Sequence, residues 1–270
     1  MTKAADQPAK PAKKKETTGE IIRSFLFMVL LALVFRSVAY EPFHIPSGSM
    51  LSTLYEGDYI FVSKFSYGYS RYSFPFSPKL FEGRIWKTEP KRGDVVVFRN
   101  PNDLGKDYIK RIIGLPGETI QVTRGRLYIN GTMVDQTRRG EVNLPGACGN
   151  LRAVERYDET LPGGHTHTVL DDSNVLDDLN NRCSAEVEAR MRVLQGMRLD
   201  ADNTREYTVP AGHYFMMGDN RDHSQDSRFS PELGYEDAPG YVPFENIVGR
   251  ADIIAFSLKG LGGRWFKRIE

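Results

Sequence analysis

The sequence has only two cysteines in 270 residues, Cys148 and Cys183, and no Cys-x-x-Cys pair. This spacing indicates neither a zinc site nor a redox motif, and it leaves open whether the two cysteines form a disulfide. Neither sign of charge is in clear excess, because 36 basic residues balance 35 acidic ones. The composition therefore gives no reason to expect a nucleic-acid partner. The apolar content of 40% is typical of a globular protein rather than a disordered or fibrous one.

Long hydrophobic runs are also scarce, and the single one lies near the N-terminus. Residues 21–40 form an apolar block of helical length, and twenty helical residues rise about 30 Å, which is roughly the hydrocarbon thickness of a bilayer. No charge interrupts residues 25–35, although Arg23 and Arg36 bracket them and would have to extend toward the two interfaces. We interpret residues 21–40 as one transmembrane anchor.

The charge on either side of this block predicts its orientation. Residues 1–20 form a polar tail with five lysines, and we expect this tail to be disordered and cytoplasmic, with the rest of the chain outside. A cleavable signal peptide is the alternative, because small residues occur at 37–39. Arg36 and the long N-terminal tail favour an uncleaved anchor. A buried soluble helix is disfavoured, since the block has almost no polar face.

After the anchor, short runs rich in Ile, Val, Tyr and Phe alternate with turn signals, which predicts a mainly β fold built on an antiparallel sheet. Asn130-Gly131 between two such runs predicts a hairpin with a type I′ turn. Trp86 and Trp265 are interpreted as packing residues. The strands are expected within residues 58–65, 93–98, 107–113, 119–122, 126–129, 132–134, 206–209, 213–217 and 247–256.

A polar segment, residues 136–205, separates two groups of these strands. Its position predicts a smaller α+β lobe inserted into a β core that comprises residues 41–135 and 206–270. One amphipathic helix is expected in the lobe, over residues 185–197.

Three segments carry candidate chemistry, and the first is the turn that follows the anchor. Pro42 and Pro46 forbid a helix there, and Gly48 lets the backbone turn sharply between Ser47 and Ser49. A serine is thus held on a stiff turn near an apolar surface. Taken alone, this pattern is also that of an ordinary loop.

The second segment, residues 108–117, places two neighbouring cations on one strand. Since side chains alternate between the faces of a strand, Lys110 and Arg111 point in opposite directions, and burial of either face takes one cation with it. Reaching the neutral amine at pH 7 costs lysine about 4.6 kcal/mol from its ordinary pKa, but only about 1.4 kcal/mol if burial lowers that pKa to about 8. Arginine has no such option. A solvated strand lysine is the ordinary alternative.

The third segment, residues 218–228, is dense in Gly, Asp, Asn and Ser, which predicts a tight, internally hydrogen-bonded loop. Asp226 and Arg228 are spaced to form an ion pair across it. The acidic spacing does not match a calcium-binding loop, and the pair His165 and His167 is interpreted as part of a loop. No metal is expected.

Together these segments, in this order behind an anchor, resemble type I signal peptidases, the membrane-bound serine proteases that release signal peptides from exported proteins. The resemblance covers the anchor and most of residues 40–135 and 209–250, but not the polar segment. Family members from other bacteria often have two membrane spans, and this chain shows one. The motifs that carry the resemblance are Pro-Ser-Gly-Ser-Met at 46–50, Gly-Asp-Tyr-Ile at 57–60, Arg-Gly-Asp-Val at 92–95, Tyr-Ile-Lys-Arg-Ile-Ile-Gly-Leu-Pro-Gly at 108–117 and Gly-Asp-Asn-Arg-Asp at 218–222.

The resemblance implies a role for each matching residue. Ser49 would be the nucleophile and Lys110 its general base, while the Ser47 side chain would help to bind the oxyanion. Ser224 would orient the lysine. Asp226 and Arg228 would form a structural pair in the same loop, and shallow apolar pockets for small substrate residues would be lined by Phe43, Ile45, Met50 and Ile109.

The same resemblance implies the setting of the reaction. The expected partners are pre-proteins with N-terminal signal peptides and the lipid bilayer, with no nucleic acid, no cofactor and no metal. The expected location is the bacterial inner membrane, with a single span, a cytoplasmic N-terminus and an extracytoplasmic catalytic domain.

Three alternatives remain at this point. A histidine-based serine hydrolase would use His44, His213 or His223, but the Gly-x-Ser-x-Gly turn is missing around Ser49 and no βαβ alternation is present. A self-cleaving Ser/Lys repressor is disfavoured by the membrane segment. A non-enzymatic anchored β-domain would place no demand on Ser49 or Lys110.

Overall fold

The computed structural model describes residues 17–79, 81–145, 151–171, 201–258 and 264–270. The chain divides into two compact units, and the division falls between Arg36 and Ser37. The helix α1 (Thr18–Val38) has no buried residue, and its length and composition allow it to cross a membrane. The expected helix over residues 21–40 is therefore present, shifted by two to three residues.

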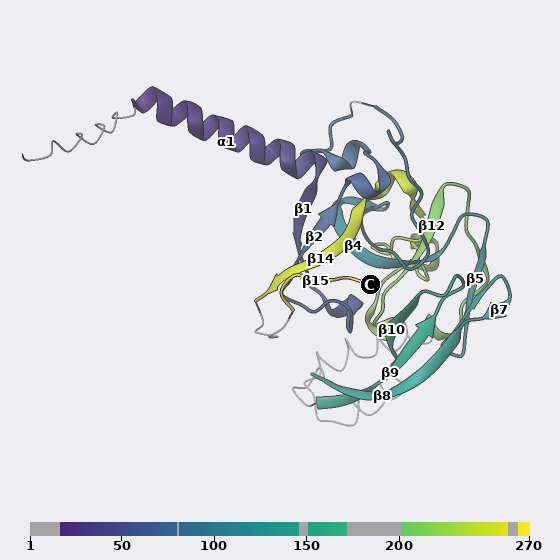
Figure 1. The fold of residues 1–270 in the computed structure, drawn as a ribbon. Coiled ribbons are helices and arrows are strands. Elements are labelled where there is room, and N and C mark those ends of the chain that lie inside the picture. The colour runs from purple at the N-terminus through teal and green to yellow at the C-terminus, as the bar shows by residue number, and fades with distance from the viewer. Residues whose placement is uncertain (1–16, 80, 146–150, 172–200, 259–263) are drawn as a thin grey trace, which may run out of the picture. The chain divides into compact units, whose positions relative to one another are not determined.

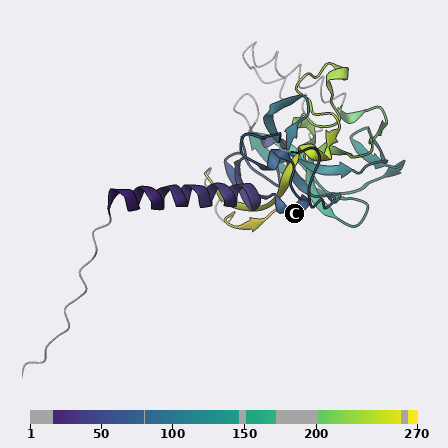
Figure 2. The ribbon, with the colours of Figure 1, turned by 90° about the horizontal axis from the view of Figure 1, so that it is seen from above.

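The unit that begins at Ser37 is mainly β, as expected from the sequence (Figure 1). Its largest sheet has the order β1-β2-β14-β3-β4-β12-β13, with β15 added to β14, and each of these neighbours is antiparallel. Seen from the perpendicular direction, its strands curl rather than lie flat (Figure 2). The strands are β1 (Tyr40–His44), β2 (Asp58–Ser63), β3 (Val95–Asn100), β4 (Asp103–Gly114), β12 (His213–Met217), β13 (Val242–Pro243), β14 (Ile247–Ser257) and β15 (Lys267–Arg268).

A smaller sheet contains the predicted hairpin. Its order is β11-β5-β6-β7, and β6 is joined to β7 through Asn130 and Gly131, whose φ angles are 51° and 73°. Positive φ at both central residues is what a type I′ turn requires. The strands are β5 (Thr119–Thr123), β6 (Arg126–Ile129), β7 (Thr132–Met133) and β11 (Tyr207–Thr208).

The described part of the predicted lobe forms a third sheet, in the order β10-β9-β8. Its strands are β8 (Asp135–Pro145), β9 (Leu151–Thr160) and β10 (Thr166–Asp171); the sequence predicts an α+β lobe here but not the positions of these strands. The helix expected over residues 185–197 lies outside the described residues, as do Cys148 and Cys183. The division into core and inserted lobe remains a prediction.

Short 3-10 helices occupy several turns of the same unit. They are η1 (Gly48–Met50), η2 (Phe65–Tyr67), η3 (Arg71–Ser73), η4 (Arg221–His223), η5 (Pro231–Leu233) and η6 (Phe244–Asn246). The first of these contains the serine singled out above.

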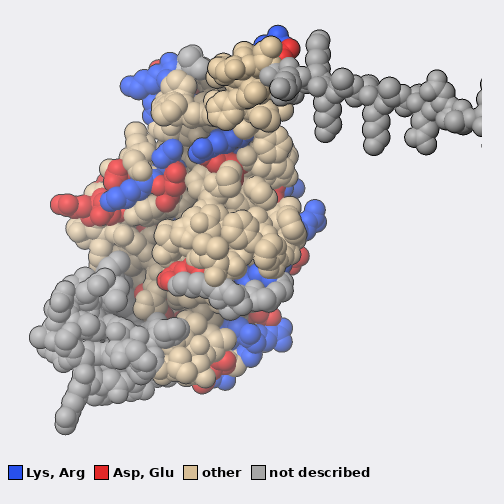
Figure 3. Space-filling model, turned by 90° about the vertical axis from the view of Figure 1, so that its left-hand side faces the viewer, with Lys and Arg blue, Asp and Glu red and all other residues tan. Residues whose placement is uncertain are grey.

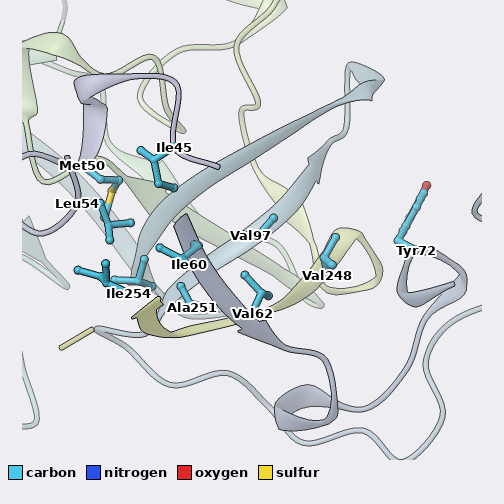
Figure 4. Packing of buried hydrophobic residues seen from close by; sticks show 11 residues of the cluster. Ile45, Met50, Leu54, Ile60, Val62, Tyr72, Val97, Val248, Ala251 and Ile254 are labelled. Atoms are coloured by element: carbon cyan, nitrogen blue, oxygen red, sulfur yellow. The ribbon is translucent and has the colours of Figure 1, made fainter. Parts of the chain in front are cut away.

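A hydrophobic cluster packs η1 against the main sheet (Figure 4). Ile45, Met50 and Leu54 flank Ser49 along the chain, and all three are buried with Ile60 and Ile254 of the sheet. Burying a side chain of this size stabilises a fold by about 1.5–3 kcal/mol. The turn is therefore held by apolar packing on both sides of the serine.

The two tryptophans pack at the edge of the fold rather than in the core. Trp86 is 81% exposed and contacts Tyr69, and Trp265 is 65% exposed and contacts Phe256. On the face shown in Figure 3, cationic and anionic side chains are interspersed among the described residues, in keeping with the balanced charge of the sequence.

Candidate active site

Ser49 and Lys110 come together although 61 positions separate them in the chain. Ser49 lies in η1 and Lys110 lies on β4, and both are buried. The Lys110 Nζ donates a hydrogen bond of 2.6 Å to the Ser49 Oγ. The strand β4 is interior, paired with β3 and β12, and Lys110 itself lies opposite Val96 of β3, which holds its backbone in place.

Burial strips the Lys110 amine of water and lowers its pKa from 10.5 to about 8. The carboxylates of Asp226 and Asp219 act in the opposite direction, and the Arg228 guanidinium adds to the lowering. At neutral pH a useful fraction of the amine is therefore unprotonated, and a neutral amine next to a hydroxyl can accept its proton.

The loop of residues 218–228 holds the backbone of the serine turn. The Asn220 backbone N–H donates to the Ser49 carbonyl oxygen at 3.1 Å, and the Asn220 side-chain amide donates to the Gly48 carbonyl oxygen at 2.9 Å. Gly218 permits this approach, since a Cβ there would lie 2.2 Å from the Ser224 Oγ and 2.6 Å from the Ser49 oxygen. Only glycine fits at that position.

Asp226 and Arg228 form a two-pronged ion pair inside this loop. The Arg228 Nε and Nη2 each lie 2.9 Å from a carboxylate oxygen of Asp226, and the Gly218 backbone N–H donates to the same carboxylate. Burial alone would raise the pKa of Asp226, but the Arg228 charge and these hydrogen bonds hold it below its ordinary value. The loop is thus held from within by a charged pair.

The structure buries both Lys110 and Arg111, where the sequence indicated burial of only one of these two. Arg111 points away from Lys110 and is fully buried against Asp219, with Nε to Oδ1 at 2.8 Å and Nη2 to Oδ2 at 2.7 Å. Thr53 also donates to Asp219. Sequence reasoning gave Arg111 and Asp219 no role, and the only signal was the presence of Asp219 in the Gly-Asp-Asn-Arg-Asp motif.

The other predicted site residues lie around the Ser49–Lys110 pair in different environments. Ser47 is exposed at the N-cap of η1, and its side chain makes no capping hydrogen bond. Ser224 is buried in the loop, and within the described residues no hydrogen bond joins its Oγ to Lys110. The orienting role of Ser224 remains a prediction.

The four predicted pocket residues fall into two groups. Ile45 and Met50 are buried in the hydrophobic cluster beneath η1, whereas Phe43 and Ile109 are half-buried against that cluster. In the structure, therefore, Phe43 and Ile109 are the two with surface left to contact a substrate.

Histidine does not contact the serine hydroxyl. Among the described residues, the hydrogen-bond partner of Ser49 Oγ is Lys110. His165 and His167 stack with ring centroids 5.8 Å apart, and His165 faces Arg111. Within the described part of the chain, no group of three or more His, Cys, Asp or Glu side chains is arranged to hold a metal ion.

A buried serine hydroxyl beside an amine of lowered pKa is the arrangement of a candidate hydrolase site, in a chain whose N-terminal helix is long and apolar enough to cross a membrane. The chain belongs to the family described as signal peptidase, peptidase S26, whose model matches residues 18–256. That match runs through the polar segment, which the motif resemblance did not cover.

Curated relatives agree with this family. The chain is 41% identical over 250 residues to a signal peptidase I from Rickettsia typhi, covering 92% of this chain and 83% of the relative. It is 42% identical to a signal peptidase I from Rickettsia canadensis, covering 90% and 82% of the two chains. The chain is accordingly a signal peptidase, an enzyme that removes signal peptides.

One solved structure is also similar, a signal peptidase I from Enterococcus faecalis V583. It shares 24% sequence identity, and the match covers 60% of this chain and 97% of that one, with a TM-score of 0.29.

The lowered pKa of Lys110 predicts how stability depends on pH. Because the pKa falls from 10.5 in the unfolded chain to about 8 in the fold, the wild type loses stability as the pH drops from 10.5 to 8. Lys110→Met removes this cost and should raise the free energy of unfolding by roughly 3 kcal/mol at about pH 7, with a smaller gain above about pH 10.5. Urea unfolding of the full chain in detergent micelles measures both values.

The matched control for this substitution is Lys106→Met, on the same strand. Lys106 is half exposed and paired with Asp103 and Asp237, so its replacement should change stability little at either pH. A Lys110→Met protein no more stable than wild type at about pH 7 would show that the amine is not desolvated as described.

Proposed function

We propose that Ser49 and Lys110 form the catalytic dyad that cleaves the signal peptide. The observation that carries this proposal is the 2.6 Å hydrogen bond between a buried amine with a pKa of about 8 and a buried hydroxyl. Neutral Lys110 takes the Ser49 proton as the Oγ attacks the scissile carbonyl carbon. The resulting ammonium then returns the proton to the leaving amine as the peptide bond breaks, and an acyl-enzyme ester is left on Ser49.

Water completes the cycle by the same route. Lys110, neutral again, accepts a proton from the water that attacks the ester, and it returns that proton to the Ser49 oxygen as the signal peptide leaves with a free carboxylate. The cycle consumes one water and regenerates both side chains. No cofactor or metal is needed for it.

The oxyanion of each tetrahedral intermediate would be held by the Ser49 backbone N–H and the Ser47 hydroxyl. Ser47 lies two residues from the nucleophile, and its side chain is not used to cap η1, which supports this role. One such donor contributes roughly 3–4 kcal/mol to the stabilisation of a transition state. We also propose that Phe43 and Ile109 line the surface that receives small substrate residues, with Ile45 and Met50 beneath them.

The enzyme would act at the outer face of the bacterial inner membrane. Only eleven positions separate Ser49 from Val38, where α1 ends, so the nucleophile lies close to the end of the apolar helix along the chain. The five lysines before the helix support a cytoplasmic N-terminus and an extracytoplasmic catalytic unit. The substrates would be pre-proteins whose signal peptides lie in the same bilayer.

Cleavage of a pre-protein with Ala-x-Ala before the cut site tests the dyad. Ser49→Ala and Lys110→Met should each reduce cleavage to background, because one lacks the nucleophile and the other the base. Ser47→Ala should lower the rate about 10²- to 10³-fold. Wild-type activity should rise with pH through a midpoint of about 8, as Lys110 loses its proton.

The control for the dyad is again Lys106→Met, which removes an exposed lysine from the same strand and should retain wild-type rates. Circular dichroism of each variant separates lost chemistry from lost folding. A folded Lys110→Met protein that cleaves as fast as wild type would contradict the proposal.

The orientation can be tested in intact spheroplasts with an N-terminal epitope tag. Protease added from outside should digest the unit from Ser37 onward and leave a tagged fragment of the size of the tail and α1. Permeabilised cells provide the control, because there the tag should be lost as well. Loss of the tag in intact spheroplasts, with the catalytic unit preserved, would reverse the proposed sidedness.

A further inference from the structure

Asn220, which holds the backbone of the serine turn, is flanked by two buried ion pairs. Its neighbour Asp219 pairs with Arg111 on β4, at 2.7 Å, and its other neighbour Arg221 pairs with Glu159 on β9, at 2.5 Å. All four charged side chains are at least nine-tenths buried. Asn220 is therefore fixed from both sides, once by the main sheet and once by the sheet β8–β10.

The sheet β8–β10 makes further contacts with this part of the loop. The Leu170 backbone N–H donates to the Asp219 carbonyl oxygen at 2.8 Å, and Leu170 and Asn220 form a parallel bridge. The Arg221 carbonyl oxygen accepts a hydrogen bond from Arg228 at 2.6 Å. A chain of contacts therefore links Glu159 on β9, through Arg221, to the Asp226–Arg228 pair.

Glu159 is held as a carboxylate by its partners. Burial would raise its pKa, but the Arg221 charge and the hydrogen bonds from Arg221 and Gln136 hold that pKa below the ordinary value. The Gln136 side chain donates to the second carboxylate oxygen at 2.8 Å, so both oxygens are satisfied. His167 lies between the two acids, 3.5 Å from Glu159 and 3.9 Å from Asp219, and burial lowers its pKa to about 3, which leaves it neutral.

A buried ion pair of this kind is a poor source of net stability, because desolvating both charges costs about as much as their attraction returns. What it does supply is a single geometry, since either charge left alone in the interior is strongly unfavourable. Here the ion pair with Glu159 fixes the position of Arg221. Because Arg221 is next to Asn220, the pair also fixes the contact of Asn220 with the Ser49 backbone.

We propose that Glu159 is a positioning residue for the peptidase reaction, and that the sheet β8–β10 serves as a brace for the loop of residues 218–221. The proposal rests on the proposed roles of Ser49 and Lys110. Without the Glu159 carboxylate, Arg221 is left buried and unpaired, and residues 219–221 shift to expose it. Asn220 then holds the Ser49 turn less precisely against Lys110.

Glu159→Gln tests this role with the least change in shape. We expect kcat to fall about ten- to hundredfold, because a small misplacement of reacting groups has effects of this size, while KM for a signal-peptide substrate stays within about twofold. The backbone amides of residues 218–224 should exchange hydrogen faster than in wild type. The midpoint of the pH profile should stay near that of wild type, since Lys110 remains buried.

The neighbouring residue on the same strand provides the matched control. Asp158 pairs with Arg139 at 2.7 Å on the partly exposed side of β9, and Asp158→Asn should leave kcat and loop exchange unchanged. Glu159→Asp keeps the charge but shortens its reach, so it should recover part of the kcat lost in Glu159→Gln. If Glu159→Gln folds poorly, Glu159→Asp still tests the proposal.

A double-mutant cycle shows whether Glu159 acts through Arg221. In an Arg221→Gln background, Glu159→Gln should cause no further loss of kcat. A folded Glu159→Gln protein with wild-type kcat and loop exchange would overturn the proposal, as would fully independent effects of the two substitutions. Ser49→Ala separates the two proposals, because a Ser49→Ala protein that stays active refutes the dyad, whereas a normal Glu159→Gln protein refutes only the brace.

Discussion

The burial of one amine beside one hydroxyl is the constraint on which the site depends. Lys110 is desolvated enough to lower its pKa to about 8, and it lies 2.6 Å from Ser49. A buried lysine is unfavourable in itself, so the rest of the structure has to hold it in place. The pairing of β4 with β3 holds the backbone of Lys110, and the apolar packing of Met50 holds the turn that carries Ser49.

The charges around Lys110 are arranged so that they do not cancel the effect of burial. Asp219 and Asp226 both favour the protonated amine, and each is neutralised by its own arginine, Arg111 and Arg228. Either acid without its partner would attract a proton to Lys110 and raise its pKa. The two ion pairs therefore help to keep the Lys110 amine in the neutral form that the proposed proton transfer needs, and they also shape the loop that contacts the serine turn.

Much of the fold follows from local sequence signals. Asn130-Gly131 dictates its hairpin through positive φ, and the apolar run before residue 40 dictates α1. The positions of the strands β8 to β10 within the predicted α+β lobe were not found, because they form a polar, partly exposed ribbon in which ion pairs such as Arg139 with Asp158 replace an apolar alternation.

The site was predictable only in part. Ser49 and Lys110 were singled out by a stiff turn and by the ability of lysine to lose its proton, but their proximity came from family resemblance rather than from spacing. The burial of Arg111 could not be foreseen, because its partner Asp219 lies 108 positions away. Glu159 carried no signal, since its partner Arg221 lies 62 positions away in η4 and only the tertiary fold brings the two together.

The most direct measurement of the central claim is an NMR titration of the Lys110 side chain in the full chain, with lysine labelled at the ε carbon and Lys110→Met used to assign its signal. The structure predicts a midpoint of about 8, far below that of the exposed lysines. A midpoint close to 10.5 would mean that the amine is solvated and charged at neutral pH, which would contradict its proposed role as the base.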